Sequence, residues 1–275
     1  MKFEVLFDHG EGPDSPDPAL ARYGNLGFPS PGGRPWIYAN FVQSLDGIVS
    51  LLGNEASGAD ISGLQEDRWL MDLLRAHADA VILGMGTLRT EKRLQRPGPR
   101  GPVFRIMDPE LQQLRSRLGR GRERNVLVSA RADFQLCDYA VFDGKLVDAT
   151  VLTTHEGARK LQAQRNSGVE VLGVDSAGER IDLVKAVALL QERYGIRYLL
   201  CEGGPSLYGS MLTSGLIDEK FLTVSPMEVG DMSVDGRRPT ILPGVALHKD
   251  NAVRWRWLSC RKAGDHQFHR FRREP

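Results

Sequence analysis

Two adjacent glycines follow a buried strand near residue 200 and stand directly before a predicted helix. Residues 197–201 have a strand-like apolar pattern, Glu202 comes next, and Gly203 and Gly204 lead to Pro205, a residue common at helix starts. Adjacent glycines let a ligand approach the backbone closely, and a helix N-terminus attracts an anion such as a pyrophosphate. A tight strand–helix turn would use the same residues, so the motif by itself leaves both interpretations open.

Two other predicted strands end in residue types that suit a nucleotide. The strand 79–83 runs into Gly84, Gly86 and Thr87, and the Thr87 hydroxyl is a candidate helix N-cap. The strand 125–129 ends in Ser129, and Arg131 follows two residues later. A hydroxyl and a guanidinium at this spacing can hold a monophosphate such as the 2′-phosphate of NADP. Capping by Thr87 and Ser129, with a solvent-facing Arg131, would explain the same residues.

Candidate substrate residues lie at a strand end and in an apolar helix. Ser44 and Asp46 place a hydroxyl and a carboxylate after the strand 36–42, although Asp46-Gly47 is also an ordinary turn signal. Arg75 stands on an otherwise apolar helix face and needs an anion, either a carboxylate or a substrate phosphate. Glu202 is a candidate carboxylate in the same cleft.

The elements that must position these residues alternate between strands and helices through most of the chain. This alternation predicts an α/β fold with a mostly parallel sheet, covered by helices on both faces. The strand-rich tail predicts an antiparallel C-terminal edge, with 266–272 as the edge strand. Residues 1–34 are rich in Gly and Pro and predict an extended arm, either a partly ordered tail or a segment that covers a pocket or a partner subunit, so we treat 35–275 as one domain.

Composition excludes several classes of protein. The 275 residues carry a net charge of +1, which predicts no nucleic-acid partner and no anionic membrane surface. No apolar run is long enough to span a membrane, and no signal peptide is evident at the N-terminus. Three widely spaced cysteines predict neither disulfides nor a metal site, and a cytoplasmic protein is expected. The sequence lacks the HxE…PCxxC signature of zinc-dependent deaminases, which predicts that it contains no deaminase domain.

Taken in order, the motifs from about Pro35 onward resemble the reductase domain of bacterial riboflavin biosynthesis, the RibD C-terminal domain family. The resemblance rests on QSLDG at 43–47, ISG at 61–63, LRAHADAVILGMGT at 74–87, EGGPSLYGSML from 202 and GLIDE ending at 219. It implies a dihydrofolate-reductase-like fold, a homodimer and a stand-alone reductase. The implied reaction uses NADPH to reduce the ribosyl group of a phosphorylated diaminopyrimidine to a ribityl chain.

The resemblance also assigns roles to individual residues. At the NADPH site it implies Val42, Thr87, Ser129, Gly203, Gly204, Pro205, Ser206 and Leu207, to which the strand-end motifs above add Gly84, Gly86 and Arg131. Those implied at the substrate are Ser44, Asp46, Arg75, Glu91, Arg96 and Glu202. Arg75 and Arg96 would hold the phosphate. Asp46, and after it Glu202, would protonate or stabilise the developing iminium nitrogen.

One loop departs from the family pattern and leaves the substrate open. After Thr87 the family continues with an acidic pair, whereas this chain has Glu91 followed by Lys92. Dihydrofolate or another pteridine is therefore an alternative substrate for the same fold and cofactor. A non-catalytic nucleotide-binding protein is a third possibility, which the presence of both Asp46 and Glu202 argues against.

Overall fold

A computed structural model describes residues 3–10, 17–51, 58–94, 98–164, 169–177, 180–234 and 236–274. Arg96, an expected phosphate ligand, lies outside these residues. In the described part of the chain, no helix is both long and apolar enough to cross a membrane. The same residues contain no group of three or more His, Cys, Asp or Glu side chains that could hold a metal ion.

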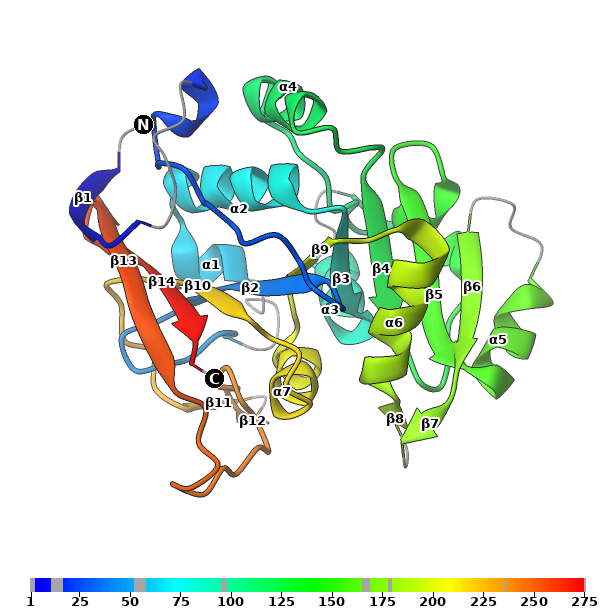
Figure 1. Cartoon of the computed structure of the whole chain (residues 1–275). Coiled ribbons are helices and arrows are strands. Elements are labelled where there is room, and N and C mark those ends of the chain that lie inside the picture. The colour runs from blue at the N-terminus through cyan, green and yellow to red at the C-terminus, as the bar shows by residue number, and fades with distance from the viewer. Residues whose placement is uncertain are drawn as a thin grey trace.

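Ten strands of the described chain form one sheet in the order β1-β13-β14-β10-β2-β9-β3-β4-β5-β6 (Figure 1). The run from β10 to β6 is parallel throughout, and β14, β13 and β1 are antiparallel additions. The strands are β1 (Glu4–Asp8), β2 (Trp36–Gln43), β3 (Ala80–Gly84), β4 (Arg124–Val128), β5 (Asp148–Thr154), β6 (Val169–Val174), β9 (Tyr198–Cys201), β10 (Glu219–Val224), β13 (Trp255–Ala263) and β14 (His266–Arg273). The expected mostly parallel α/β sheet with an antiparallel edge is confirmed.

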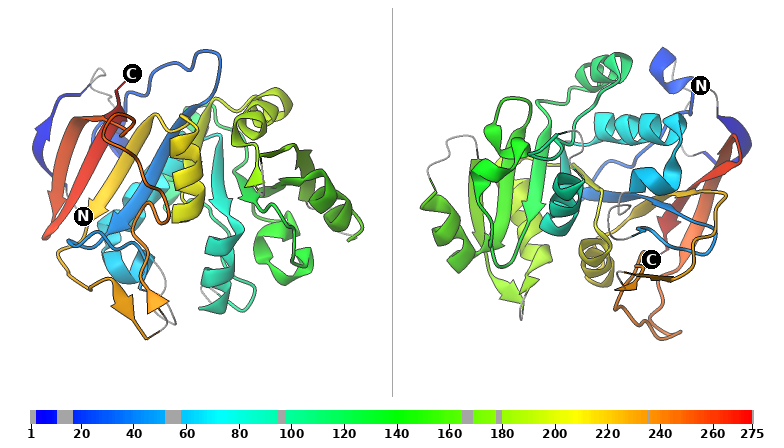
Figure 2. Two further views of the ribbon diagram at one scale, coloured as in Figure 1. Left: turned by 90° about the horizontal axis from the view of Figure 1, so that it is seen from below. Right: turned by 180° about the vertical axis from the view of Figure 1, so that it is seen from behind.

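Helices cover both faces of the parallel strands, as expected (Figure 2). They are α1 (Gly58–Ser62), α2 (Gln65–His77), α3 (Met85–Arg93), α4 (Pro109–Arg117), α5 (His155–Gln162), α6 (Leu183–Tyr194) and α7 (Pro205–Thr213). Two short ribbons pair β7 (Ser176–Ala177) with β8 (Arg180–Ile181) and β11 (Met232–Ser233) with β12 (Gly236–Arg237).

The side chains of β3 show how the two cores divide. Val81 and Leu83 join a core with α2, α3 and α4, whereas Ala80 and Ile82 join a core with α6 and α7. Successive strand residues point to opposite faces, so a strand covered on both sides must be apolar throughout. This explains why the predicted strands of the parallel region are continuous apolar runs.

The edge of the sheet differs from the expectation. The strand expected at the edge, now β14, lies between β13 and β10, and β1 from the N-terminal segment forms the edge instead. Phe3, Leu20 and Leu26 of that segment are buried in the core of their own chain, whereas Val5 and Leu6 are exposed. The division of the chain at residue 35 stays a prediction.

Candidate active site

Two helices begin side by side at the carboxyl ends of the neighbouring parallel strands β3 and β9. Gly84 caps α3 and Gly204 caps α7, so neither helix N-terminus has a side-chain cap, and Pro205 opens α7 as predicted. The amide of Gly84 donates to the carbonyl of Gly203 at 2.8 Å, which ties the two starts together. Uncapped N–H groups and two positive dipole ends therefore meet at one point, an arrangement that favours a bound anion.

The glycines are required at this junction by close approach. A Cβ on Gly204 would lie 3.0 Å from the Thr87 hydroxyl, and a Cβ on Gly203 would lie 3.3 Å from the ring of Phe41. Gly203 has a φ of 97°, a conformation that L side chains rarely adopt, and the Gly203–Gly204 peptide bond is cis. The backbone of β9 thus reaches α3 with no side chain in between.

Thr87 does not have the capping role that the sequence suggested. Gly84 is the N-cap of α3, and Thr87 lies inside the first turn with its hydroxyl directed at Gly204. Gly86 in the same turn is exposed, Leu207 of α7 is buried, and Ser206 is exposed. The expected cofactor residues of two strand ends are therefore brought together around a single junction.

This junction is also the switch point of the sheet. The chain leaves β3 through α3 toward β4, and it leaves β9 through α7 toward β10 on the other side. α3 belongs to one core and α7 to the opposite core, so the two connections diverge across the sheet. Crevices at such points are the usual ligand sites of open α/β sheets.

A buried ion pair lies on the α2 face beside this junction. The Nε and Nη2 atoms of Arg75 donate to the two carboxylate oxygens of Glu202 at 2.7 and 2.6 Å, and both side chains are nearly inaccessible. Its Nη1 donates to the carbonyl of Arg105 at 3.0 Å and lies 3.4 Å from an Asp72 oxygen. Of the two anions that the sequence left open for Arg75, the structure supplies the carboxylate, and each of its three guanidinium nitrogens already has a partner among the described residues.

Ser44 and Asp46 form a separate polar corner after β2. The Ser44 hydroxyl donates to Asp46 at 2.5 Å, and the amides of Val229 and Gly230 donate to the same carboxylate at 3.3 and 2.7 Å. The Ser44 hydrogen bond, followed by these backbone amides, holds the pKa of Asp46 below its usual value. Asp46 is therefore an anion at neutral pH and fits charge stabilisation better than proton donation.

The third of the candidate strand ends belongs to β4, which pairs with β3 in the sheet. Ser129 follows β4 and accepts a hydrogen bond from the amide of Ala132 at 3.2 Å, while the Arg131 side chain is exposed. Glu91 is half-buried on α3, two turns from the junction. Its role at a substrate stays a prediction, as does that of Arg96.

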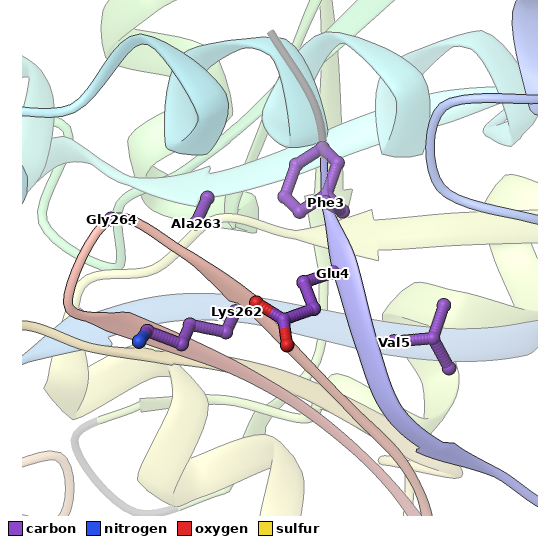
Figure 3. Close-up of a pocket in the computed structure, with 6 residues that line it drawn as sticks. All are labelled: Phe3, Glu4, Val5, Lys262, Ala263 and Gly264. Carbon is purple, nitrogen blue, oxygen red and sulfur yellow. The ribbon is translucent and has the colours of Figure 1, made fainter.

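One hollow lies elsewhere, at the antiparallel edge of the sheet. About 580 Å³ of open space is lined by Phe3, Glu4 and Val5 at the start of β1 and by Lys262, Ala263 and Gly264 at the end of β13 (Figure 3). Strands β14, β10 and β2 separate it from β9. It contains none of the residues that the sequence singled out.

Sequence analysis passed over Asn40, a partly buried residue of β2 whose Oδ1 atom has no hydrogen-bond partner in the described part of the chain. The signal was present, because Asn40 is the one polar residue within the apolar run Trp36–Val42. A polar side chain inside a strand that is buried on both faces requires a partner.

Comparison with known proteins places this architecture in a family. The family model described as the RibD C-terminal domain matches residues 35–266. A 2,5-diamino-6-ribosylamino-4(3H)-pyrimidinone 5′-phosphate reductase of Archaeoglobus fulgidus is 28% identical over 78% of this chain and 90% of its own. The reductase of the same name from Methanothermobacter thermautotrophicus is 30% identical over 72% of this chain and 80% of its own.

A solved structure shares the fold. The pyrimidine reductase-like protein of Corynebacterium diphtheriae superposes with a TM-score of 0.67 at 24% identity, covering 88% of this chain and 92% of its own.

Proposed function

Because the chain belongs to the RibD C-terminal domain family, we propose that it is an NADPH-dependent reductase acting on a phosphorylated ribosylaminopyrimidine. The reaction converts the ribosyl group to a ribityl chain, as in riboflavin biosynthesis. The observation that carries the proposal is the junction of two uncapped helix N-termini beside the buried Arg75–Glu202 pair. It offers an anion site and a sheltered polar surface at the switch point of one sheet.

The residues at the junction fit a dinucleotide. Gly203 and Gly204 leave the backbone bare, and the first turns of α3 and α7 offer N–H groups to a pyrophosphate. NADPH, when bound, supplies the hydride, and the protein supplies position and charge. The Asp46 carboxylate, kept ionised by Ser44, stabilises the cationic nitrogen that develops next to the carbon being reduced. The Arg75–Glu202 pair fixes the end of β9 from which Gly203 departs.

Arg131 is the proposed contact for the 2′-phosphate that distinguishes NADPH from NADH. We expect Arg131→Gln to lower kcat/KM for NADPH by about tenfold to a hundredfold, because a charge-assisted hydrogen bond to phosphate is lost. The value for NADH should stay within about twofold, since NADH lacks that phosphate. Steady-state kinetics with both cofactors measures this, and Arg193→Gln, an exposed arginine on α6, is the control. Equal losses with both cofactors would contradict the assignment.

The proposed function is tested by following NADPH oxidation by the purified chain with two substrates offered separately. Turnover of the ribosylaminopyrimidine phosphate, and not of dihydrofolate, is the expected result. Turnover of dihydrofolate alone would move the function to pteridine reduction. Binding of NADPH without turnover of either substrate would leave a reductase of unknown substrate, and the absence of NADPH binding would contradict the assignment as an enzyme.

We also propose that the protein is a homodimer that uses the open face of the antiparallel strands. Trp257 is 45% exposed there; its ring stacks with Phe271, is tilted against His269 and meets Phe7 edge to face. Light scattering is expected to give twice the chain mass of 30.5 kDa. Trp257→Lys should shift the mass toward the monomer, because it places a charge in an apolar contact. A wild-type monomer would refute the proposal. A cytoplasmic location stays a prediction from sequence.

A further inference from the structure

A segment after β10, residues 227–240, wraps the turn that carries Asp46. It includes the short ribbon of β11 and β12 (Figure 1). Two backbone hydrogen bonds join it to this turn. The Leu45 amide donates to a carbonyl at the start of the segment at 2.8 Å, and the Val49 amide donates to a carbonyl near its end at 3.0 Å. The 227–240 segment therefore holds the turn on both sides of Asp46.

The Asp46 carboxylate is surrounded by neutral donors. It accepts from the Ser44 hydroxyl at 2.5 Å and from the amides of Gly230 and Val229 at 2.7 and 3.3 Å. The structure records no ion pair between Asp46 and a Lys or Arg of the described residues. An anion without a cationic partner relies on the dipoles that point at it. A group that fixes the Val229–Gly230 peptide therefore acts on Asp46 as well.

Arg238 holds this peptide group from its other end. The Val229 carbonyl accepts from Nη1 of Arg238, while the Gly230 amide of the same peptide group donates to Asp46. Nη1 also lies 3.4 Å from the Gly230 carbonyl, and Nε donates to the Leu51 carbonyl at 3.2 Å. The carbonyl and the N–H of a peptide group point in opposite directions. The peptide dipole is thus aligned between a guanidinium and a carboxylate.

This alignment strengthens the hydrogen bond that reaches Asp46. Hydrogen bonds in a chain polarise one another, so a cation at the carbonyl makes the N–H of the same peptide a better donor. Each of the two bonds also has one charged member, and such bonds are roughly twice as strong as neutral ones. Arg238 therefore acts on Asp46 without contacting it, and its bond to Leu51 anchors it to the chain that follows the turn.

We propose that Arg238 is a positioning residue of the reaction, which orients the Asp46 carboxylate through the Val229–Gly230 peptide group. The inference rests on the proposed function, in which Asp46 stabilises the cationic nitrogen that develops beside the carbon being reduced. A carboxylate that is oriented before the substrate binds needs no reorganisation as that charge develops.

The same contact helps to keep the carboxylate ionised. The Ser44 hydrogen bond lowers the pKa of Asp46 most, and the Gly230 and Val229 amides lower it further. Weaker amide bonds would let this pKa rise toward its usual value. The ionised fraction of Asp46 would then fall first at acidic pH, so activity that needs the carboxylate would be lost at a higher pH than in the wild-type protein.

Arg238→Met tests the proposal, because it keeps an unbranched apolar stem and removes the guanidinium. We expect kcat to fall about tenfold to a hundredfold, since charge-assisted hydrogen bonds to the peptide group are lost. The Kd for NADPH should change much less. The acidic limb of the pH profile of kcat should move to higher pH. A residue that only supported the fold would lower the melting temperature and leave the acidic limb in place.

Two further variants serve as rescue and control. Arg238→Lys keeps the charge but offers one ammonium in place of the planar fork, so it should recover part of the lost kcat and return the acidic limb toward its wild-type position. Arg237→Met removes the neighbouring exposed arginine, which pairs with Asp231 at 3.1 Å, and should change neither quantity. The exposed carboxylates Glu228 and Asp231 are the same in all three variants. Their titration cannot produce a shift that Arg238→Met shows alone.

The titration of Asp46 in the free protein is a second measurement, which requires no turnover. Carbon-13 NMR of aspartate-labelled protein follows the carboxyl signals against pH, and Asp46→Asn identifies the signal of Asp46. The pKa of Asp46 should be higher in Arg238→Met than in the wild-type protein and unchanged in Arg237→Met. An unchanged titration in Arg238→Met would overturn the inference, whatever happens to kcat.

These measurements separate failure of the inference from failure of the proposed function. A wild-type protein that does not reduce the pyrimidine, with a shifted Asp46 titration in Arg238→Met, would reject the proposed function and support the coupling of the two residues. Wild-type turnover with no shift in either measurement would reject the inference alone. The double variant Arg238→Met with Asp46→Asn should be about as slow as Asp46→Asn by itself. Additive losses in kcat would contradict action through Asp46.

Discussion

Glu202→Gln is expected to lower the free energy of unfolding by about 3 kcal/mol, because it removes the bidentate charged partner of the buried Arg75 guanidinium and leaves only the longer contact with Asp72. The same change should reduce kcat/KM for the pyrimidine on the order of a hundredfold, since the end of β9 that carries Gly203 loses its anchor to α2. Denaturant unfolding and NADPH oxidation measure the two effects.

Glu219→Gln separates stability from function in this experiment. Glu219 is a fully buried carboxylate paired with Arg270 and Arg272, but it begins β10 at the amino end of the sheet, away from the junction. Glu219→Gln should lower the free energy of unfolding about as much as Glu202→Gln does and leave kcat/KM of the folded enzyme unchanged. Identical behaviour of the two variants in both measurements would show that the Arg75–Glu202 pair is structural alone.

The double variant Arg75→Met with Glu202→Leu tests the Arg75–Glu202 pair by removing both charges at once. Replacing a buried ion pair by apolar side chains of similar size is often neutral for stability, so the double variant should be more stable than Glu202→Gln. Its turnover should remain low if the ion pair positions the site. Recovery of turnover together with stability would contradict a positioning role.

The parallel part of the fold was predictable from the sequence because its strands are apolar on both faces and its helices begin at recognisable residues. Pro205 after two glycines correctly located the start of α7. The edge was not predictable in the same way. β1 pairs with β13 more than 250 residues later, and no local pattern records such a partner.

The site was predictable in its residue types but not in its pairings. Arg75 needed an anion, and its partner Glu202 lies 127 residues away, so only the fold could choose between carboxylate and phosphate. Thr87 had the right type for a cap, but Gly84 starts the helix three residues earlier. Asn40 was overlooked because one amide in an apolar run resembles any other until its hydrogen bonds are known. The Oδ1 of the buried Asn125 on β4 accepts from the Phe104 amide, whereas the Oδ1 of Asn40 has no partner in the described chain.

Gly203→Ala is expected to cost about 1 to 2 kcal/mol of stability from its positive φ alone, and the new methyl group would also press on the Phe41 ring. The more informative effect concerns the cofactor. The Gly203 carbonyl accepts from the Gly84 amide, so a shift of this residue separates the N-termini of α3 and α7. A displacement of this kind should weaken turnover on the order of a hundredfold.

Gly195→Ala is the matched control for this last prediction. Gly195 has a φ of 65° at the end of α6, and a Cβ there would meet no atom within 4 Å. The substitution carries a similar backbone cost without a clash and far from the junction, so it should lower the melting temperature and leave the Kd for NADPH unchanged. Gly203→Ala should change both. If both variants retain wild-type affinity for NADPH, the two helix N-termini do not form the pyrophosphate site, because moving one against the other would then have no effect on binding.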